Sequence, residues 1–430
     1  MSDTLLVLLV VFLCLMLLGV PVAWSMIAAM LAWIIVADNL QFLPVIPERI
    51  YQGMDSFVLM AVPLFILAGE LINAGRITDR LIHFANVVFG WMRGGLAQVN
   101  IGASILFSGI TGVALGDIAA LGRVFIPAML RQGYSAAYAA AVTASSSIIG
   151  PMVPPSLVVV IYGSMTGLSI GALMAATLIP GLIVGIVQLA LVSIQARRYG
   201  FPRVEMDRSP RVVFSAAGDA AIPLMIPVII LAGLLGGLMT PTEAGGVAAA
   251  YALLVAMGYY RSLSVRALGE VLTRSAVFSG QLLIIVGCGA AFSWVMGMEN
   301  VPGMAAAALA EHELSYLQTL LVFNAILLLL GMVIDPTTVI ILFGPLLASS
   351  AVAAGIDPLH FGVVAILNLN IGLLTPPLGV CLFAAERIAG CGLWPLIRAS
   401  LPFLAVNLTG LAIVVIVPEF SLWLPRALGF

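Results

Sequence analysis

The sequence predicts an all-α polytopic membrane protein built from two repeats of inverted topology. Of its 430 residues 62% are hydrophobic and 8% charged, whereas a soluble chain carries roughly 25% charged residues. Apolar runs long enough to cross a bilayer, about 20 residues each, recur about ten times along the chain. Glycines and prolines of the first half reappear 222 residues later. We therefore expect each repeat to hold about five spanning helices, one re-entrant hairpin and a helix broken at the midplane.

Charge and cysteine content exclude several classes of protein. The formal net charge is −2, and all 17 cations are arginines, so the chain lacks the basic surface that binds nucleic acid. The four cysteines show no C-x-x-C spacing and no His-rich surroundings, which argues against a zinc site or a disulfide framework. The first apolar run lacks a basic region before it and leads straight into another, so we expect it to remain as a span.

Apolar runs and the residues that interrupt them define the expected elements in order. Spans are predicted near residues 5–20, 22–36, 57–74, 136–165 and 171–196, then near 220–239, 243–260, 277–297, 358–386 and 400–418. Two further segments, 96–131 and 316–352, are interrupted by turn residues and are predicted to be re-entrant hairpins. The polar segment 197–219 is predicted to be a cytoplasmic loop between the halves.

Internal self-similarity divides the chain into a first repeat, 1–196, and a second, 220–430. The matched pairs are Gly109 and Gly331, Gly122 and Gly344, Gly133 and Gly355, Gly150 and Gly372, Pro154 and Pro376, and Pro155 and Pro377. Because each repeat has an odd number of crossings, the second repeat is expected to be inverted relative to the first. The positive-inside rule agrees, since it places every arginine except Arg49, Arg123 and Arg426 at the cytoplasmic side and both termini outside.

Two segments combine arginine with apolar residues at helical spacing. Residues 76–93 and 261–274 are predicted to be amphipathic helices along the inner interface, where they could brace a moving part against a fixed one.

Each predicted broken helix contains adjacent prolines, within 148–156 of the span 136–165 and within 370–378 of the span 358–386. Proline removes an N–H and leaves carbonyl groups without intrahelical partners, and such backbone survives in a membrane only where protein, ion or water satisfies it. Freed carbonyls and a threonine hydroxyl form a hard oxygen site suited to Na⁺, and the next helix N-terminus favours an anion. The simpler alternative is a pair of kinks relieved by neighbouring helices and water.

Carboxylates within apolar segments are functional candidates. Asp117 and Asp335 could handle ion or substrate, or could cap the second limb of each hairpin. Arg123 could reach a substrate carboxylate or extend toward the cytoplasm. Glu243, in the first turn of a span, is expected to cap it.

Polar residues also precede each break. Asn368 and Asn370 could bond freed backbone groups or line a site, and Ser146 is at the matching place in the first repeat. An intramembrane aspartyl protease using Asp117 and Asp335 is a distant alternative, but no nucleophile, metal pair or nucleotide loop was found, so the chain is predicted not to be an enzyme.

At these residues the chain resembles the large membrane subunit of TRAP transporters, the tripartite ATP-independent periplasmic systems. The resemblance covers nearly the whole length and is carried by residues 108–122, 133–134, 140–156, 240–244 and 370–377. It implies an elevator-type secondary transporter in a bacterial inner membrane that takes up a small organic carboxylate, such as a C4-dicarboxylate or sugar acid, with sodium. It also implies two partners, a small four-helix membrane subunit and a periplasmic substrate-binding protein. A sodium/solute symporter of related fold without a binding protein is the nearest alternative.

The resemblance also implies two or more sodium ions held largely by backbone oxygens. The first site would use Thr111, Gly150, Val153 and Pro155. The second would use Gly331, Gly372, Thr375 and Leu378. Candidate substrate contacts are Asp117, Arg123, Ser146, Asn368 and Asn370. The family often has serine where Thr111 stands, which retains the hydroxyl.

Overall fold

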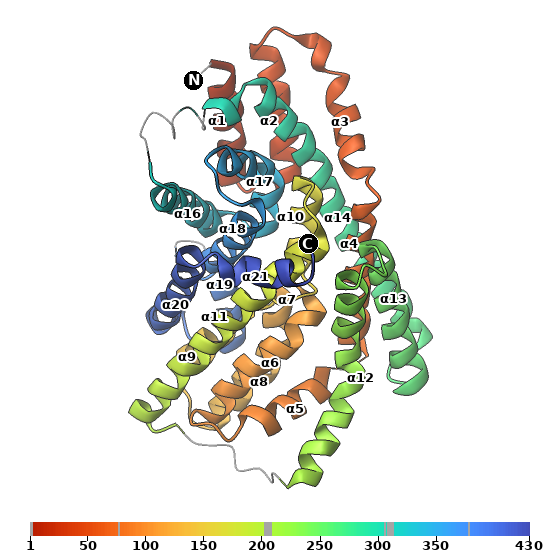
Figure 1. Ribbon diagram of the computed structural model, residues 1–430, viewed down its shortest axis with the longest axis vertical. Coiled ribbons are helices and arrows are strands. Elements are labelled where there is room, and N and C mark those ends of the chain that lie inside the picture. Colours follow the sequence, from red (N-terminus) through yellow and green to blue (C-terminus); the bar gives the residue numbers. More distant parts are fainter. Residues whose placement is uncertain (1–2, 76–77, 202–208, 305–306, 308–313, 377–378) are drawn as a thin grey trace.

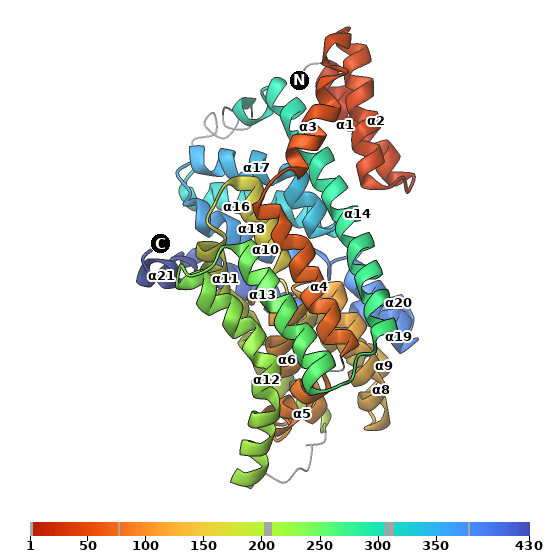
Figure 2. The ribbon, with the colours of Figure 1, turned by 90° about the vertical axis from the view of Figure 1, so that its right-hand side faces the viewer.

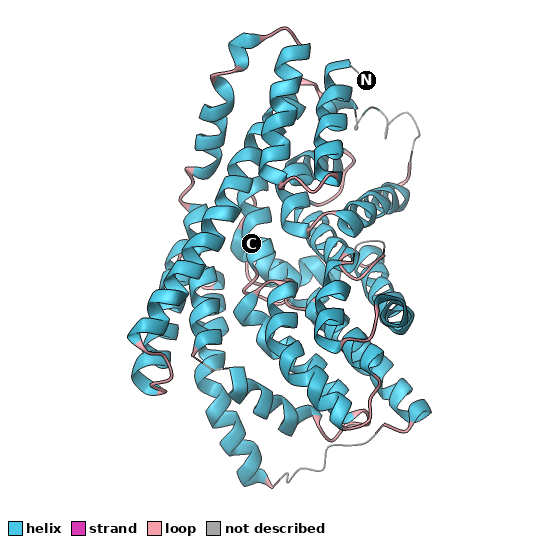
Figure 3. Cartoon of the chain, turned by 180° about the vertical axis from the view of Figure 1, so that it is seen from behind, coloured by secondary structure: helices cyan, strands magenta, loops and turns pink. Residues whose placement is uncertain are grey.

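The computed structural model describes the chain except residues 1–2, 76–77, 202–208, 305–306, 308–313 and 377–378. Every regular element of the described residues is a helix (Figure 3). This confirms the all-α class predicted from composition and apolar runs.

The first half of the chain forms eleven α-helices within the described residues. They are α1 (Asp3–Leu17), α2 (Val22–Val36), α3 (Val45–Met54), α4 (Ala61–Ala74), α5 (Thr78–Phe89), α6 (Gly95–Thr111), α7 (Ala114–Asp117), α8 (Arg123–Arg131), α9 (Ala136–Ser147), α10 (Leu157–Thr166) and α11 (Ile170–Tyr199). A π-helical turn, Ile118–Gly122, joins α7 to α8.

The second half contributes the remaining described helices. They are α12 (Pro210–Leu235), α13 (Pro241–Leu253), α14 (Val265–Met298), α16 (Tyr316–Val333), α17 (Pro336–Ala353), α18 (Pro358–Gly372), α19 (Val380–Ala389), α20 (Leu393–Ile416) and α21 (Glu419–Ala427). A π-helical stretch, Leu254–Tyr259, extends α13.

Six of the described helices are long and apolar enough to cross a membrane by themselves. They are α11, α12, α14, α16, α17 and α20. This confirms a multi-pass protein. Both limbs of the predicted second hairpin, α16 and α17, are among the six, so helix length alone does not distinguish a crossing helix from a re-entrant one. Three features therefore stay predictions: the five spans in each repeat, the inversion of the second repeat and the outer location of the termini.

Helices break inside each predicted hairpin and each predicted broken span. The first hairpin turns after α6, where Gly112 is left-handed with φ +59°, a conformation that glycine adopts without steric cost. The second turns at Ile334 and Asp335, before the proline that opens α17. The described chain is non-helical between α9 and α10, over residues 148–156, and between α18 and α19.

The helices form two groups (Figures 1 and 2). In one group α4 packs against α13 and α14, α3 packs along α14, and α1 pairs with α2. In the other group α9 packs against α6, α19 and α20, while α16 packs on α18 and α10 on α17. The groups meet where α14 contacts α17 and where α4 contacts α6 and α10. Helix α12 packs against α13 of the first group. Helix α5 contacts both α6 and α12, which places α5 between the groups.

Two sequence predictions require correction. Residues 261–274 do not form a separate interfacial helix, because α14 runs without interruption from Val265 to Met298 and neither proline nor a turn separates the arginine-bearing part from the apolar part. The loop predicted at 197–219 is shorter, since α11 continues to Tyr199 and α12 begins at Pro210. Proline at the first helical position favours this early start.

Candidate functional site

The second hairpin and the second broken helix meet through two glycines. A Cβ atom on Gly372 would lie 2.5 Å from the carbonyl carbon of Gly331 and 2.7 Å from its Cα and carbonyl oxygen. A Cβ on Gly331 would in turn lie 3.0 Å from the carbonyl oxygen of Leu369. No side chain fits between these backbones, so the structure brings together two of the four residues expected at the second ion site.

This contact joins two helix C-terminal ends. Gly331 lies in the last turn of α16, and Gly372 is the last residue of α18. The Gly372 carbonyl oxygen accepts a bond from the backbone nitrogen of Thr375 at 2.9 Å and retains a second lone pair. The aligned peptide dipoles give each helix C-terminus partial negative charge, so two such ends favour a cation between them. The Thr375 hydroxyl lies beyond the break and donates to the carbonyl oxygen of Ile371 at 3.0 Å, which leaves oxygen lone pairs available. Leu378 lies outside the described residues.

Asn368 and Asn370 are buried before this break. The amide nitrogen of Asn368 donates to the backbone and side-chain oxygens of Asn324 on α16, at 3.0 and 2.6 Å. The amide nitrogen of Asn370 donates to the carbonyl oxygen of Ile366 at 2.7 Å. Neither side-chain oxygen has a hydrogen-bond partner among the described residues. Two buried oxygens that need a donor or a cation therefore lie next to the second break.

The first hairpin meets its broken helix in a different way. A Cβ on Gly112 would lie 2.8 Å from the backbone nitrogen of Leu157 and 3.1 Å from the carbonyl oxygen of Pro155. The tip therefore packs on the end of the break, at the point where α10 begins. Thr111 is the last residue of α6, and its side chain is outside the described part of the structure.

Asp117 lies against the first break rather than at a helix start. The residue at the N-cap of α7 is Val113, and Asp117 falls inside the helical limb, so the prediction that Asp117 caps this limb is wrong. Its side chain is 1% exposed, and a Cβ on Gly150 would overlap the carboxylate. Asp117 occupies the space that the missing side chain of Gly150 leaves.

The other residues expected at the first ion site lie in the same break. Val153 is buried, and no hydrogen bond to the carbonyl oxygens of Gly150, Val153 or Pro155 is found within the described part of the chain. No three His, Cys, Asp or Glu side chains of the described residues group as metal ligands do. The groups available here as metal ligands are carbonyl and hydroxyl oxygens and one carboxylate, and oxygen ligands of this kind suit Na⁺.

Two predicted substrate residues of the first repeat differ in burial. Ser146 is fully buried, and its hydroxyl accepts a hydrogen bond from Ser104 of α6 at 2.9 Å. This bond ties the hairpin to the broken helix. Arg123 is exposed at the start of α8, so the structure does not bring it to the buried Asp117.

Sequence reasoning missed a buried polar group that joins α9, α11 and α20. The Gln188 amide donates to the side-chain oxygen of Asn407 at 2.8 Å and to the carbonyl oxygen of Ser145 at 3.0 Å. Asn407 donates to the hydroxyl of Ser145 at 3.0 Å. All three residues are nearly inaccessible. A lone amide within a long apolar run was the available signal, because such groups are costly in a membrane unless they are paired.

Two of the capping predictions are confirmed. The Asp335 carboxylate accepts hydrogen bonds from the backbone nitrogens of Thr337 and Thr338 at 3.0 and 3.1 Å. Glu243 and Thr240 form a reciprocal capping box at the start of α13. Because Asp335 caps α17 while Asp117 lies against Gly150, the structure gives no support to a catalytic aspartate pair.

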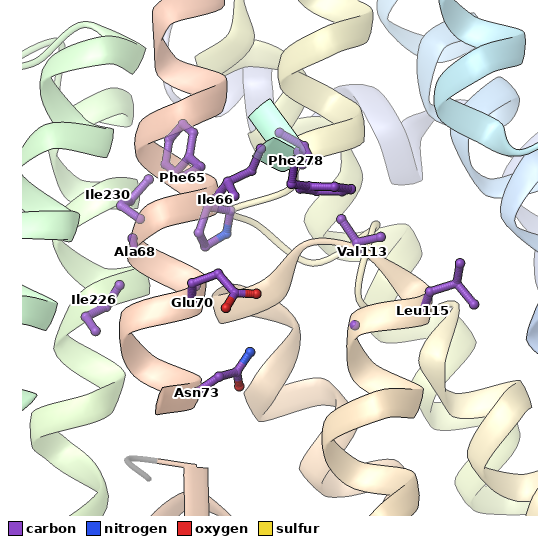
Figure 4. Close-up of a pocket in the computed structure, with 14 residues that line it drawn as sticks. Phe65, Ile66, Ala68, Glu70, Asn73, Val113, Leu115, Ile226, Ile230 and Phe278 are labelled. Carbon is purple, nitrogen blue, oxygen red and sulfur yellow. The ribbon is translucent and has the colours of Figure 1, made fainter. Parts of the chain in front are cut away.

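A cavity of about 350 Å³ lies beside the first hairpin tip. Its lining comes from α4, α12 and α14 and from Val113, Leu115 and Pro155. Figure 4 shows Ile226 and Ile230 of α12 on the side opposite Val113 and Leu115. Among the described residues that line it, Glu70 is the only charged one. Sequence reasoning did not single out this residue.

Comparisons with known proteins agree with this architecture. The family model described as the tripartite ATP-independent periplasmic transporter, DctM component, matches residues 9–420. The sialic acid TRAP transporter large permease protein SiaM of Vibrio cholerae is 38% identical over 408 residues, 95% of each chain. The C4-dicarboxylate TRAP transporter large permease protein DctM of Pseudomonas aeruginosa is 36% identical over 384 residues, 89% of each chain.

One solved structure shares the fold. The YdaH transporter of Alcanivorax borkumensis matches with a TM-score of 0.60 over 92% of this chain and 90% of that one, at 16% sequence identity. This match shows the fold. The relatives are named as transporter permeases, which agrees with a protein that is not an enzyme. The chain belongs to the DctM family and is a large membrane subunit of a bacterial TRAP transporter.

Proposed function

We propose that this permease couples the inward movement of a small organic carboxylate to sodium ions bound at the two contacts between hairpin and broken helix. Family membership places the chain in TRAP uptake, with a small membrane subunit and a periplasmic binding protein as partners. The two relatives compared above are named for sialic acid and C4-dicarboxylates, and both are carboxylates, whereas another relative is named for isethionate, a sulfonate. The observation that carries the sodium proposal is the contact of Gly331 with Gly372, which joins two helix C-termini.

The proposed coupling is energetically sufficient. One Na⁺ entering down a membrane potential of about 100 mV releases roughly 2.3 kcal/mol, before its concentration gradient is counted. Two ions release about twice as much. A singly charged anion that enters with them costs about one of these amounts, so one net positive charge still drives its uptake without ATP, whereas uptake of a doubly charged anion depends on the Na⁺ concentration gradient or on a third ion. In the proposed elevator movement the hairpins and broken helices travel together against α4, α12, α13 and α14.

The first test is uptake into proteoliposomes that hold this chain and its small membrane subunit, under an inward Na⁺ gradient. Radiolabelled sialic acid and succinate are the probes, each offered with and without the purified cognate binding protein. We expect uptake to require both the gradient and the binding protein. Uptake without the binding protein would assign the chain to ordinary sodium/solute symporters, and uptake without Na⁺ would reject the proposed ion sites.

Variants of three threonines locate the ions. Thr375→Val removes the hydroxyl at the second break, and Thr111→Val removes the one at the first hairpin tip. A hydrogen-bonding group that contacts a charge contributes about 1.5–3 kcal/mol, so each change should raise the Na⁺ concentration for half-maximal uptake about tenfold or more. Thr409→Val is the matched control, because the Thr409 hydroxyl also bonds the carbonyl oxygen four residues earlier but is exposed on α20.

A further inference from the structure

The cavity beside the first hairpin tip has an apolar body and one polar end. Phe65, Ile66, Ile226, Ile230 and Phe278 form most of its wall on the side of α4, α12 and α14. Glu70 and Asn73 lie one and two turns further along α4, at one end of the cavity in Figure 4. Its volume of about 350 Å³ falls within the range of small-ligand sites.

An ion pair marks the polar end. The guanidinium Nε of Arg274 lies 3.4 Å from Oε2 of Glu70, and the two side chains are 60% and 36% exposed. No other hydrogen bond to either side chain is found among the described residues. Arg274 precedes Phe278 by four residues on α14, so the arginine and the aromatic wall lie on the same face of the helix. The pair thus offers an acceptor and a donor to a further ligand.

We propose that this cavity binds a phospholipid with an ethanolamine headgroup. The ammonium group donates to the Glu70 carboxylate, the phosphate accepts from the Arg274 guanidinium, and one acyl chain fills the apolar body. The assignment rests on charge complementarity. A zwitterionic headgroup offers a cation to Glu70 and an anion to Arg274, whereas a singly charged ligand would match only one of the two side chains. A small carboxylate fits less well, since Arg274 could donate to it but the Glu70 carboxylate would then face a second anion.

The location of the pair agrees with a lipid of the inner leaflet. Glu70 lies in the last two turns of α4 and pairs with Arg274, which the positive-inside rule places on the cytoplasmic side. The acyl chain would then extend from that end toward Phe65 and Phe278.

The lipid would also contact the first hairpin. Val113 and Leu115 of the tip line the cavity opposite α4 and α12, so a bound acyl chain fills the space between them. Any displacement of the tip relative to α4 must rearrange or release this chain. This consequence rests on the proposed elevator movement, whereas lipid binding itself does not.

Native mass spectrometry of the complex with its small subunit tests the binding. The purified complex is exchanged into mixed micelles containing equal amounts of phosphatidylethanolamine, phosphatidylcholine and phosphatidylglycerol, and retained lipid is counted. We expect about tenfold preference for the ethanolamine lipid at one site, because choline cannot donate a hydrogen bond to Glu70 and glycerol carries no cation. Glu70→Gln and Arg274→Gln should each abolish the preference. Glu270→Gln, a carboxylate change one turn away on α14 and outside the lining, should retain it.

A second variant separates loss of the site from loss of the fold. Phe278→Ala shortens the apolar wall at a residue that is 41% exposed, so the protein should fold and retain less lipid of every headgroup. Equal retention of all three lipids by the wild type, or an unchanged preference in Glu70→Gln, would overturn the proposal. Displacement of the lipid by millimolar succinate would also overturn it, because the cavity would then belong to the solute pathway.

A transport arm distinguishes this inference from the proposed function. Uptake is compared in proteoliposomes with and without ethanolamine lipid, for the wild type and Glu70→Gln. If wild-type uptake depends on ethanolamine lipid and Glu70→Gln removes this dependence, the result supports both the lipid site and the proposed transport function. A headgroup preference in the mass spectra together with no sodium-driven uptake in any lipid would retain the lipid site and reject the proposed function.

Discussion

The two contacts between hairpin and broken helix arise from the same spacing of glycines and prolines but are built differently. In the second contact the backbones of Gly331 and Gly372 touch, and two helix C-termini supply partial negative charge. In the first contact the Asp117 side chain lies against Gly150, so an ionisable carboxyl group occupies the corresponding space. From this comparison we expect substitutions at the second contact to affect stability and uptake mainly through the size of the new side chain. Substitutions at the first contact should act through both size and charge.

The largest expected effect is that of Gly372→Ala. The added Cβ would lie 2.5 Å from a backbone carbon of Gly331, and backbone atoms of two packed helices cannot move aside as a flexible side chain can. We expect destabilisation of about 3 kcal/mol, the upper part of the usual range for overpacking, and loss of uptake. Chemical denaturation in detergent and the proteoliposome assay measure the two quantities.

Gly344→Ala is the matched control for this change. Gly344 lies in α17, and its nearest neighbouring atom would be 3.5 Å from the new Cβ, which is ordinary van der Waals contact. Alanine is favoured over glycine in a helix by about 1 kcal/mol, so this variant should be at least as stable as the wild type. Equal losses in both variants would show that the close approach of Gly331 and Gly372 has no special role.

Gly150→Ala tests the first contact and should cost about 2 kcal/mol, because the new methyl group must displace the Asp117 carboxylate. The double variant Gly150→Ala with Asp117→Ser should recover about 1 kcal/mol of this loss, since a shorter side chain frees the space. Unfolding free energies of the two single variants and the double variant give the coupling. Additive losses would mean that Gly150 and Asp117 do not share this space.

The sequence predicted the places of these contacts better than their chemistry. The offset of 222 residues and the adjacent prolines located both breaks, because proline and glycine act locally on the backbone. The proximity of Asp117 to Gly150 could not be predicted, since it depends on how the hairpin rotates against α9. Glu70 was missed for the same reason, because only tertiary packing places it in a cavity with Arg274 nearby.

Predicted boundaries were wrong where a polar segment was taken to be separate from the apolar helix beside it, since 197–219 was predicted to be a loop and 261–274 a separate amphipathic helix. Residues 210–219 and 265–274 contain arginine and belong to α12 and α14. A long membrane helix can extend beyond the apolar layer, where charged side chains favour water. The arginines therefore mark the edge of the membrane rather than the end of the helix.

Asp335→Ala should have a smaller effect than either glycine substitution. The change removes the two backbone hydrogen bonds that cap α17, and loss of such a cap costs about 1 kcal/mol. Asp335→Asn keeps an acceptor and should lose only part of this amount in the same denaturation measurement. If Asp335→Asn instead abolished uptake at unchanged stability, the carboxylate charge would matter at the second contact too, and the contrast with Asp117 would fail.

The smallest effects are expected from the hydrogen bonds that tie each hairpin to its broken helix. Between helices, Asn368→Ala removes two bonds to Asn324, whereas Ser146→Ala removes one bond from Ser104. Ser146→Ala also removes a bond within α9, to the carbonyl oxygen of Thr143. Interhelical hydrogen bonds in membranes contribute about 0.6 kcal/mol on average, so Asn368→Ala should cost about twice as much as Ser146→Ala in unfolding free energy. Asn368 also presents a buried oxygen that has no partner among the described residues, which Ser146 does not. A change in the Na⁺ concentration for half-maximal uptake in Asn368→Ala but not in Ser146→Ala would therefore indicate that this oxygen binds the ion. Equal changes in both variants would indicate that both residues only hold the hairpin against the broken helix.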